Sequence, residues 1–192
     1  MALFRRKKDT RTPEEIQAAE LKSTYEWIQC FIAALILCVF VFLFFFKVID
    51  VVGTSMYPTL NDGDKMLVSG LFYTPKQGDV VILKKDSYDE NKALVKRVIA
   101  VEGQEINMDF EKGIVYVDGE EIHEDYIADL TYNKLDFIGP KTVPEHCVFV
   151  MGDNRNMSTD SRKSEIGMVD SRLIIGKAYF VLFPANDMGP IN

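Results

Sequence analysis

A long apolar run near the N-terminus limits what this chain can fold into more than any other feature. Between Cys30 and Phe46 no residue is polar, and Trp27 and Ile28 extend the stretch to twenty residues with Gln29 as the one interruption. A helix of about 20 residues crosses a bilayer core of about 30 Å. A soluble domain rarely buries a helix that is apolar on every face, and no small-residue cleavage site follows the run, as it would in a signal peptide. The sequence therefore predicts a transmembrane helix over residues 27–46.

Charges on the two sides of this span predict its orientation. Basic residues lie close before it, whereas only Lys47 follows it closely; the preceding ones are Arg5, Arg6, Lys7, Lys8 and Arg11. Positive flanks stay in the cytoplasm. We therefore expect a single-pass protein of the cell membrane, with residues 1–26 in the cytoplasm and residues 47–192 as an extracytoplasmic domain in contact with the lipid bilayer.

A helix-start signal precedes the span. Thr12 is suited to the N-cap, Pro13 to the first helical position, and Glu15 follows the cap by three residues. This is the pattern of a capping box with proline at the first position. We expect the helix to begin at Pro13 and to continue into the apolar run.

Charge and composition argue against several classes of partner. The 192-residue chain carries a net charge of −7, from 22 Lys+Arg against 29 Asp+Glu. Phosphate binding needs a basic footprint, so we expect no nucleic-acid partner, and the phosphate-loop and dinucleotide motifs are missing, so we expect no nucleotide. Cys147 is the one cysteine after residue 46, and His123 and His146 stand in no metal pattern. We expect no disulfide in this domain, no metal and no cofactor.

Residues 47–192 show the pattern of a mostly β domain. Short runs rich in β-branched and aromatic residues alternate with turn residues, as strands require. These runs are 48–52, 65–68, 79–83, 93–101, 113–117, 147–151 and 173–183. Asp118-Gly119 is a hairpin signal, because a tight primed turn needs residues that accept positive φ. Residues 124–142 have no strong period, and we expect them to form a long excursion over the surface.

The first candidate for chemistry is Ser55, which follows a predicted strand and lies among Gly53, Thr54, Met56 and Pro58. Small neighbours and a proline-fixed turn can present a hydroxyl to a substrate while nearby N–H groups face an oxyanion. Such residues also make ordinary turns, so this segment alone does not decide between the two interpretations.

The second candidate is Lys96, within the apolar run 93–101. In a strand Lys96 shares one face with Leu94 and Val98, while Arg97 lies on the other face. A lysine buried there must be paired or neutral, and a neutral amine can take a proton from a serine hydroxyl. The alternative is a lysine at the edge of a sheet with its ammonium group in water.

A third candidate is the polar stretch 151–162, which directly follows an apolar strand. It fails as a calcium loop, because Arg155 lies two residues after Asp153, where an oxygen ligand is needed. Its Asp, Asn, Ser and Arg side chains can instead form a hydrogen-bonded support for a reactive group. A Ser-His-Asp triad using His146 remains possible by composition, although a surface histidine is the commoner case.

These three stretches, in this order after one N-terminal span, resemble the type I signal peptidase (leader peptidase) family in its compact single-span bacterial form. The matches are Ser-Met-Tyr-Pro-Thr-Leu (55–60), Lys-Arg-Val-Ile (96–99), and Gly-Asp-Asn-Arg (152–155) with Ser158, Asp160, Ser161 and Arg162. The resemblance implies a coiled, mostly antiparallel β-sheet domain on a membrane helix. It also implies a serine–lysine endopeptidase that removes signal peptides from exported preproteins, with Ser55 as nucleophile and Lys96 as general base.

The resemblance also suggests roles for the surrounding residues. We expect Ser55 and Lys96, 41 residues apart, to meet through neighbouring strands, and Ser158 to hydrogen-bond the lysine head. Two ion pairs are expected to hold the polar loop: Asp160 with Arg162, and Asp153 with Arg155. Gly53 stands where some members place a hydroxyl residue toward the oxyanion, so the oxyanion hole would use backbone N–H groups, chiefly that of Ser55. Asn156 stands where many members have Asp.

Substrate choice is expected to come from the shape of shallow apolar pockets that admit small side chains. Their predicted walls are Val51, Val52, Met56 and Val95, and oversized side chains would clash there. A second set of residues could contact the lipid interface or could equally be core aromatics: Tyr57, Leu71, Phe72 and Tyr73.

Two other functions stay open from the sequence. One is a dedicated serine–lysine processing peptidase for a single pilus or conjugation protein. The other is a membrane-anchored β-rich binding protein without catalysis.

Overall fold

The computed structural model describes residues 12–84 and 93–191, and within these the chain divides into two units between Phe44 and Phe45. The first unit contains the helix α1 (Pro13–Phe45) up to Phe44; this helix has no buried residue and is long and apolar enough to cross a membrane. Its start forms the expected capping box: Glu15 N donates to Thr12 Oγ1 over 3.3 Å, and Thr12 N donates to Glu15 Oε2 over 2.8 Å. The basic residues 5–11 that predicted the orientation lie outside the described residues.

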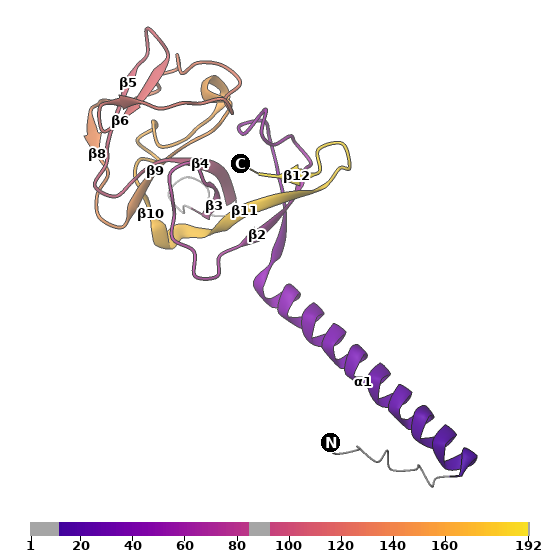
Figure 1. Cartoon of the computed structure of the whole chain (residues 1–192). Coiled ribbons are helices and arrows are strands. Elements are labelled where there is room, and N and C mark those ends of the chain that lie inside the picture. Colours follow the sequence, from indigo (N-terminus) through magenta and orange to yellow (C-terminus); the bar gives the residue numbers. More distant parts are fainter. Residues whose placement is uncertain (1–11, 85–92, 192) are drawn as a thin grey trace, which may run out of the picture. The chain divides into compact units, whose positions relative to one another are not determined.

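The second unit consists of two antiparallel sheets, so the mostly β prediction is confirmed (Figure 1). The larger sheet has, in spatial order, β1 (Lys47–Asp50), β2 (Lys65–Ser69), β11 (Ile174–Phe183), β3 (Val80–Lys84), β4 (Ala93–Val101), β9 (Cys147–Met151) and β10 (Val169–Asp170), with β12 (Gly189–Pro190) paired to β11. The smaller sheet has β7 (Glu120–Glu121), β6 (Ile114–Val117), β5 (Glu105–Asp109) and β8 (Lys141–Thr142). Two short 3₁₀ turns, η1 (Arg155–Met157) and η2 (Ser171–Leu173), complete the described elements.

The predicted hairpin is present between β6 and β7. Val117 pairs with Glu120, and the two residues between them, Asp118 and Gly119, have φ of 54° and 82°. Positive φ at both central positions is what a type I′ turn requires, and asparagine, aspartate and glycine accept it at least cost. Each of the other predicted runs likewise contains a strand.

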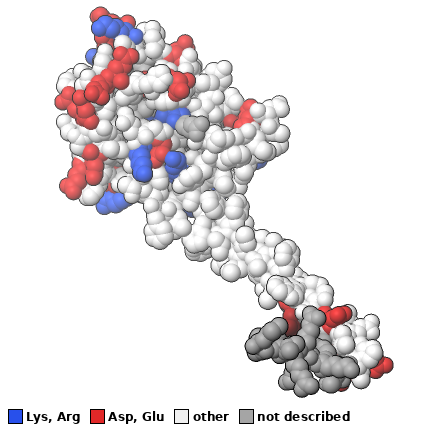
Figure 2. Space-filling model, in the orientation of Figure 1, with Lys and Arg blue, Asp and Glu red and all other residues white. Residues whose placement is uncertain are grey.

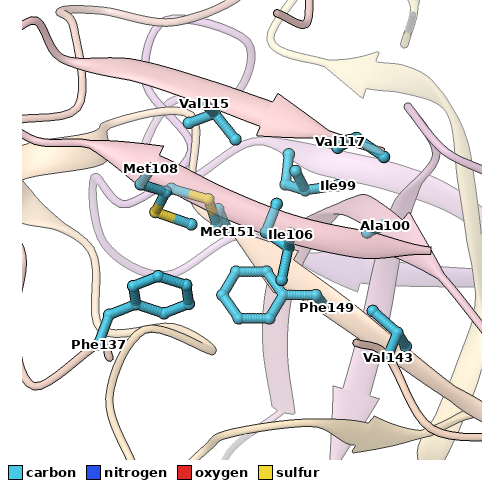
Figure 3. Packing of buried hydrophobic residues seen from close by; sticks show 10 residues of the cluster. All are labelled: Ile99, Ala100, Ile106, Met108, Val115, Val117, Phe137, Val143, Phe149 and Met151. Carbon is cyan, nitrogen blue, oxygen red and sulfur yellow. The ribbon is translucent and has the colours of Figure 1, made fainter. Parts of the chain in front are cut away.

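A hydrophobic core joins the two sheets and also includes part of residues 124–142. Figure 3 shows Ile99 and Phe149 of the larger sheet packed with Ile106 of the smaller sheet and with Phe137. The rings of Phe137 and Phe149 meet edge to face with centroids 5.8 Å apart. Most of residues 124–142 are exposed, as a long excursion over the surface predicts, but Phe137 and Thr131 are buried and anchor the segment. Residues 124–142 lack a regular sequence period because a few buried side chains anchor them, with little regular pairing of their backbone.

Acidic side chains are the commoner charged groups on the face of the molecule that Figure 2 shows. They gather over the part of the second unit where Figure 1 draws β5, β6 and β8. This distribution agrees with the net charge of −7 of the chain.

Candidate active site

Ser55 and Lys96 lie together although their strands are not neighbours. Lys96 is on β4, and Ser55 is in the turn after β1, but β2, β11 and β3 separate these strands in the sheet. The expectation that neighbouring strands bring the two residues together is therefore wrong. The sheet is coiled instead, so that the segment after β1 packs through Val51 and Met56 on the same apolar cluster as Val95.

The two side chains are within hydrogen-bonding distance. Lys96 Nζ lies 2.7 Å from Ser55 Oγ and 2.8 Å from the carbonyl oxygen of Val95. Lys96 is 3% exposed, whereas Ser55 is only half-buried. The arrangement leaves the hydroxyl open to a substrate and keeps the amine out of bulk water.

Burial changes the acidity of this lysine. It lowers the pKa of Lys96 from 10.5 to about 8, because the ammonium form loses its hydration. The carboxylates of Asp160 and Asp153 oppose this shift, and the guanidinium of Arg162 adds to it. A pKa near 8 leaves a usable fraction of neutral amine close to physiological pH, as a general base requires.

The turn that presents Ser55 is held from both sides. Gly53 has φ of 90°, which a glycine adopts without strain, and its N–H donates to Asp62 Oδ1 over 2.7 Å. Asn154 N donates to the carbonyl oxygen of Ser55, and Asn154 Nδ2 donates to that of Thr54, each over 3.1 Å. The Gly53 N–H is thus committed to the turn. Within residues 12–84 and 93–191, the Ser55 N–H has no hydrogen-bond partner, so of the two N–H groups it is the one that could donate to an oxyanion.

The polar loop 152–162 contains one ion pair that was predicted and lacks another. Arg162 binds Asp160 with both partners buried, through Nε–Oδ1 and Nη2–Oδ2 contacts of 2.8 Å each. Asp160 Oδ2 also accepts the N–H of Gly152 over 3.1 Å. This pair therefore fixes the start of the loop, as expected.

The predicted pairing of Asp153 with Arg155 is wrong. Asp153 forms a bidentate pair with Arg97 on β4, with contacts of 2.9 and 2.7 Å, and Thr59 Oγ1 donates to its Oδ2 over 2.5 Å. Arg155 instead pairs with Glu124 and donates to Thr131 Oγ1 over 2.9 Å. Asp153 lies just beyond β9, where Met151 is opposite Arg97, whereas Arg155 begins the turn η1 and points to residues 124–133.

Ser158 does not make its expected bond to Lys96. Its hydroxyl oxygen is buried, and among the described residues it has no hydrogen-bond partner. Gly152 lies between this hydroxyl and the nucleophile turn: a Cβ at Gly152 would be 2.3 Å from Ser158 Oγ and 2.4 Å from the carbonyl oxygen of Ser55. Only glycine fits at this position.

Asn156 has a structural explanation as an amide. Its Oδ1 accepts the N–H groups of Tyr132 and Asn133 over 3.1 and 3.0 Å, and its Nδ2 donates to the carbonyl oxygen of Leu130 over 3.0 Å. A carboxylate would provide the two acceptors but not the donor. The side chain therefore holds residues 130–133 on the polar loop rather than forming a salt bridge.

The predicted pocket residues differ in their exposure. Val51 and Met56 are 4% and 1% exposed and belong to the core, whereas Val52 is 88% exposed and Val95 is half-buried. Of the aromatic and aliphatic residues considered for lipid contact, Tyr57, Leu71 and Phe72 are exposed, while Tyr73 is half-buried and donates to Asp79 Oδ2 over 2.7 Å.

His146 lies away from Ser55. Its imidazole is exposed, with Nδ1 3.8 Å from Glu102 and Nε2 3.5 Å from Glu145. A triad of Ser55 with this histidine has no support in the geometry.

Four residues at the site carried no assigned role in the sequence: Thr59, Arg97, Tyr126 and Asn154. Thr59 and Asn154 lie inside the motifs 55–60 and 152–155, so their positions in the sequence already indicated that they belong to the site. Arg97 was recognisable as a second cation in an apolar strand. Tyr126 comes from the segment without a period, where no local pattern points to it.

The chain is similar in sequence to known proteins over most of its length. Residues 24–183 match the family described as Signal peptidase, peptidase S26. The signal peptidase I of Bacillus licheniformis is 36% identical over 187 residues, which cover 91% of this chain and 97% of that protein. Signal peptidase I T of Bacillus subtilis (strain 168) is 33% identical over 190 residues, 94% and 96% of the two chains. A crystal structure of a signal peptidase I from Enterococcus faecalis is 26% identical, with a TM-score of 0.45, and the match covers 58% of this chain and 98% of that one. By the extent of the family and sequence matches, the chain belongs to the signal peptidase family, peptidase S26.

Proposed function

We propose that this protein is a membrane-anchored signal peptidase I that cleaves signal peptides from exported preproteins, with Ser55 as nucleophile and Lys96 as general base. The single observation that carries the assignment of these residues is the 2.7 Å contact between Ser55 Oγ and the Nζ of a lysine that is 3% exposed. The family supports the activity, and the contact supports the two roles.

The reaction follows from this contact. Neutral Lys96 takes the hydroxyl proton as Ser55 Oγ attacks the scissile carbonyl carbon, and the N–H of Ser55 binds the oxyanion. The protonated amine then gives its proton to the leaving amino group, which leaves an acyl-enzyme. Lys96, neutral again, takes a proton from a water molecule that attacks the ester carbonyl, and gives this proton to Ser55 Oγ as the ester bond breaks and the signal peptide leaves.

The surrounding residues are proposed to support this chemistry without reacting. Three buried ion pairs fix the loop that contacts the turn of Ser55: Asp153 with Arg97, Asp160 with Arg162, and Glu124 with Arg155. Ser158 packs against Gly152 with its hydroxyl buried, and is proposed to support the same loop. Gly53 holds the turn and leaves the oxyanion to the Ser55 N–H.

Small side chains before the cut are proposed to fit pockets near the dyad. Val52 offers an exposed apolar side chain three residues before Ser55, and Val51, Met56 and Val95 form the firm base beneath this segment. A packed base of this kind does not yield to a large side chain, so exclusion by size is the expected source of selectivity.

The membrane arrangement belongs to the same proposal. Helix α1 would anchor the protein, residues 1–26 would stay in the cytoplasm, and residues 47–192 would act outside it on substrates in the same bilayer. The excess of basic residues before the span supports this orientation.

The test compares four variants on several preproteins: two single variants, their double variant and one control. Ser55→Ala and Lys96→Ala should each reduce cleavage by roughly 10³-fold or more, and the double variant should be no worse than either single one, because the two groups act as a unit. His146→Ala is the matched control and should keep close to the parent rate. Loss of cleavage in a folded His146→Ala protein would return the histidine triad to first place, and cleavage of only one preprotein would favour a dedicated peptidase.

A further inference from the structure

Tyr126 lies against Arg97, the residue next to the proposed general base. The guanidinium carbon of Arg97 is 3.9 Å from the centre of the Tyr126 ring, and Arg97 is 1% exposed. The hydroxyl of Tyr126 donates to Glu124 Oε1 over 3.2 Å. An aromatic ring at this distance holds a desolvated guanidinium by cation–π attraction and by covering it.

Arg97 reaches the base through Asp153 and not directly. Lys96 and Arg97 are consecutive residues of β4, so their side chains lie on opposite faces. The bidentate pair that Arg97 forms with Asp153 nevertheless balances a carboxylate whose charge acts on Lys96. A guanidinium in a fixed position is therefore needed to limit the effect of that carboxylate.

Among residues 12–84 and 93–191, few other groups act on Lys96. They are the hydroxyl of Ser55 and the carbonyl oxygen of Val95, which contact its Nζ, and the charged groups of Asp153, Asp160 and Arg162. Asp160 has its own buried partner in Arg162. Tyr126 can therefore influence Lys96 through the Arg97–Asp153 pair, because its ring contacts Arg97 and the charge of Asp153 acts on Lys96.

We propose that Tyr126 is a positioning residue for the general base: its ring holds Arg97 on Asp153 and thereby sets the charge balance around Lys96. Residues 124–133 then support catalysis, because they place this ring against Arg97, on the face of β4 opposite Lys96. The inference rests on the proposed function of Lys96 as base.

The direction in which removal of the ring shifts the pKa of Lys96 can be predicted. Without it, Arg97 is held less firmly, the charge of Asp153 is less balanced, and water enters beside β4. Both changes favour the ammonium form and raise the pKa of Lys96 above about 8. The rising limb of activity against pH should therefore move to higher pH.

The experiment measures kcat/KM of the full-length protein in detergent on a signal-peptide substrate, from about pH 6 to about pH 11. Tyr126→Leu should move the midpoint of the limb upward by about one pH unit, the lower end of what an unbalanced nearby charge produces. Activity should recover on the plateau at high pH. Tyr126→Phe keeps the ring and should leave the midpoint in place.

The matched control is Tyr132→Leu, an exposed tyrosine of the same segment whose backbone N–H contact to Asn156 the substitution preserves. Its midpoint should equal that of the parent. If Tyr126→Leu does not fold, Tyr126→Met fills similar space without an aromatic face and should give the same upward shift.

The outcomes separate this inference from the proposed function. A folded Tyr126→Leu or Tyr126→Met protein that loses activity equally at every pH, or keeps the parent midpoint, overturns the positioning role. A parent protein without a limb near pH 8, together with an active Lys96→Ala variant, overturns the assignment of the base itself.

Discussion

Lys96 makes the site reactive at a cost to the folded state. Its pKa falls from 10.5 to about 8 on folding, so between these values the unfolded chain binds more protons than the folded chain does. Stability should therefore rise with pH over this interval, and the full cost is present below about pH 8. A shift from 10.5 to about 8 corresponds to about 3 kcal/mol.

Replacing this lysine by an apolar residue of similar length should stabilise the protein. We expect Lys96→Met to raise the free energy of unfolding by about 1 to 3 kcal/mol at pH 7, less than the full cost because two hydrogen bonds are lost. The gain should shrink as the pH approaches 10. Urea unfolding of the full-length protein in detergent measures it.

Ser55→Ala serves as the control for that measurement. It should be equally inactive but keeps the buried amine, so it should show little of the gain. A Lys96→Met protein less stable than the parent at pH 7 would mean that the ammonium is better compensated than its burial indicates.

Among the structural elements, the polar loop depends on one close approach. Gly152 has no room for a Cβ, because one neighbour at 2.4 Å is the backbone oxygen of Ser55, which cannot move aside without displacing the nucleophile. Gly152→Ala should lower kcat by roughly 100-fold, since a displacement of about 1 Å has an effect of that size. Peptide cleavage and thermal unfolding of the same preparation check this.

Gly189→Ala is the comparison for that variant. Gly189 has no heavy atom within 4 Å of an added Cβ, and its substitution should leave kcat near the parent value. Full activity of Gly152→Ala would show that the turn of Ser55 has more freedom than its contacts indicate.

The elements also show why part of the structure was predictable. Strand runs, the Asp118-Gly119 turn and the candidates Ser55 and Lys96 depend on local patterns of apolar and turn residues. The partners of Asp153 and Arg155 do not: Arg97 is 56 residues from Asp153, and Glu124 is 31 from Arg155. A pattern within the loop suggested the near neighbour, whereas the pairing of β4 with β9 brings Arg97 to Asp153, and the segment after β7 brings Glu124 to Arg155.

Residues 124–133 illustrate the same limit. They lack a strand period because they are fixed by side chains and single backbone contacts, such as that of Ala128 N with the carbonyl oxygen of Asp153. The coiling of the larger sheet was likewise available only from the resemblance. No local pattern states that the turn after β1 packs on the cluster containing Val95.

For the whole molecule, the anchor should matter more for embedded substrates than for soluble ones. A protein that begins near Lys47 should cleave a soluble peptide at a rate near that of the full chain, but should process a preprotein in vesicles at least about 10²-fold more slowly. The reason is that sharing a bilayer raises the effective concentration without any new contact.

The comparison uses both proteins at equal concentration on both substrates. Equal rates on the preprotein in vesicles would mean that the span only directs the protein to its compartment. A loss on the soluble peptide would mean that the anchor also supports the fold.

The connection between α1 and Ser55 is short, and its length limits how far Ser55 can lie from the end of the helix. Helix α1 ends at Phe45, so Ser55 is ten positions further along the chain (55 − 45), and ten extended residues reach at most about 35 Å. With the helix embedded in the bilayer, Ser55 can act only on peptide bonds within that distance of the end of the helix. In a preprotein whose cleavage site lies within a few residues of its own apolar segment, the scissile bond is within this distance as soon as the segment is in the bilayer. A long polar spacer between the apolar segment and the cleavage site would place the bond beyond it and slow cleavage.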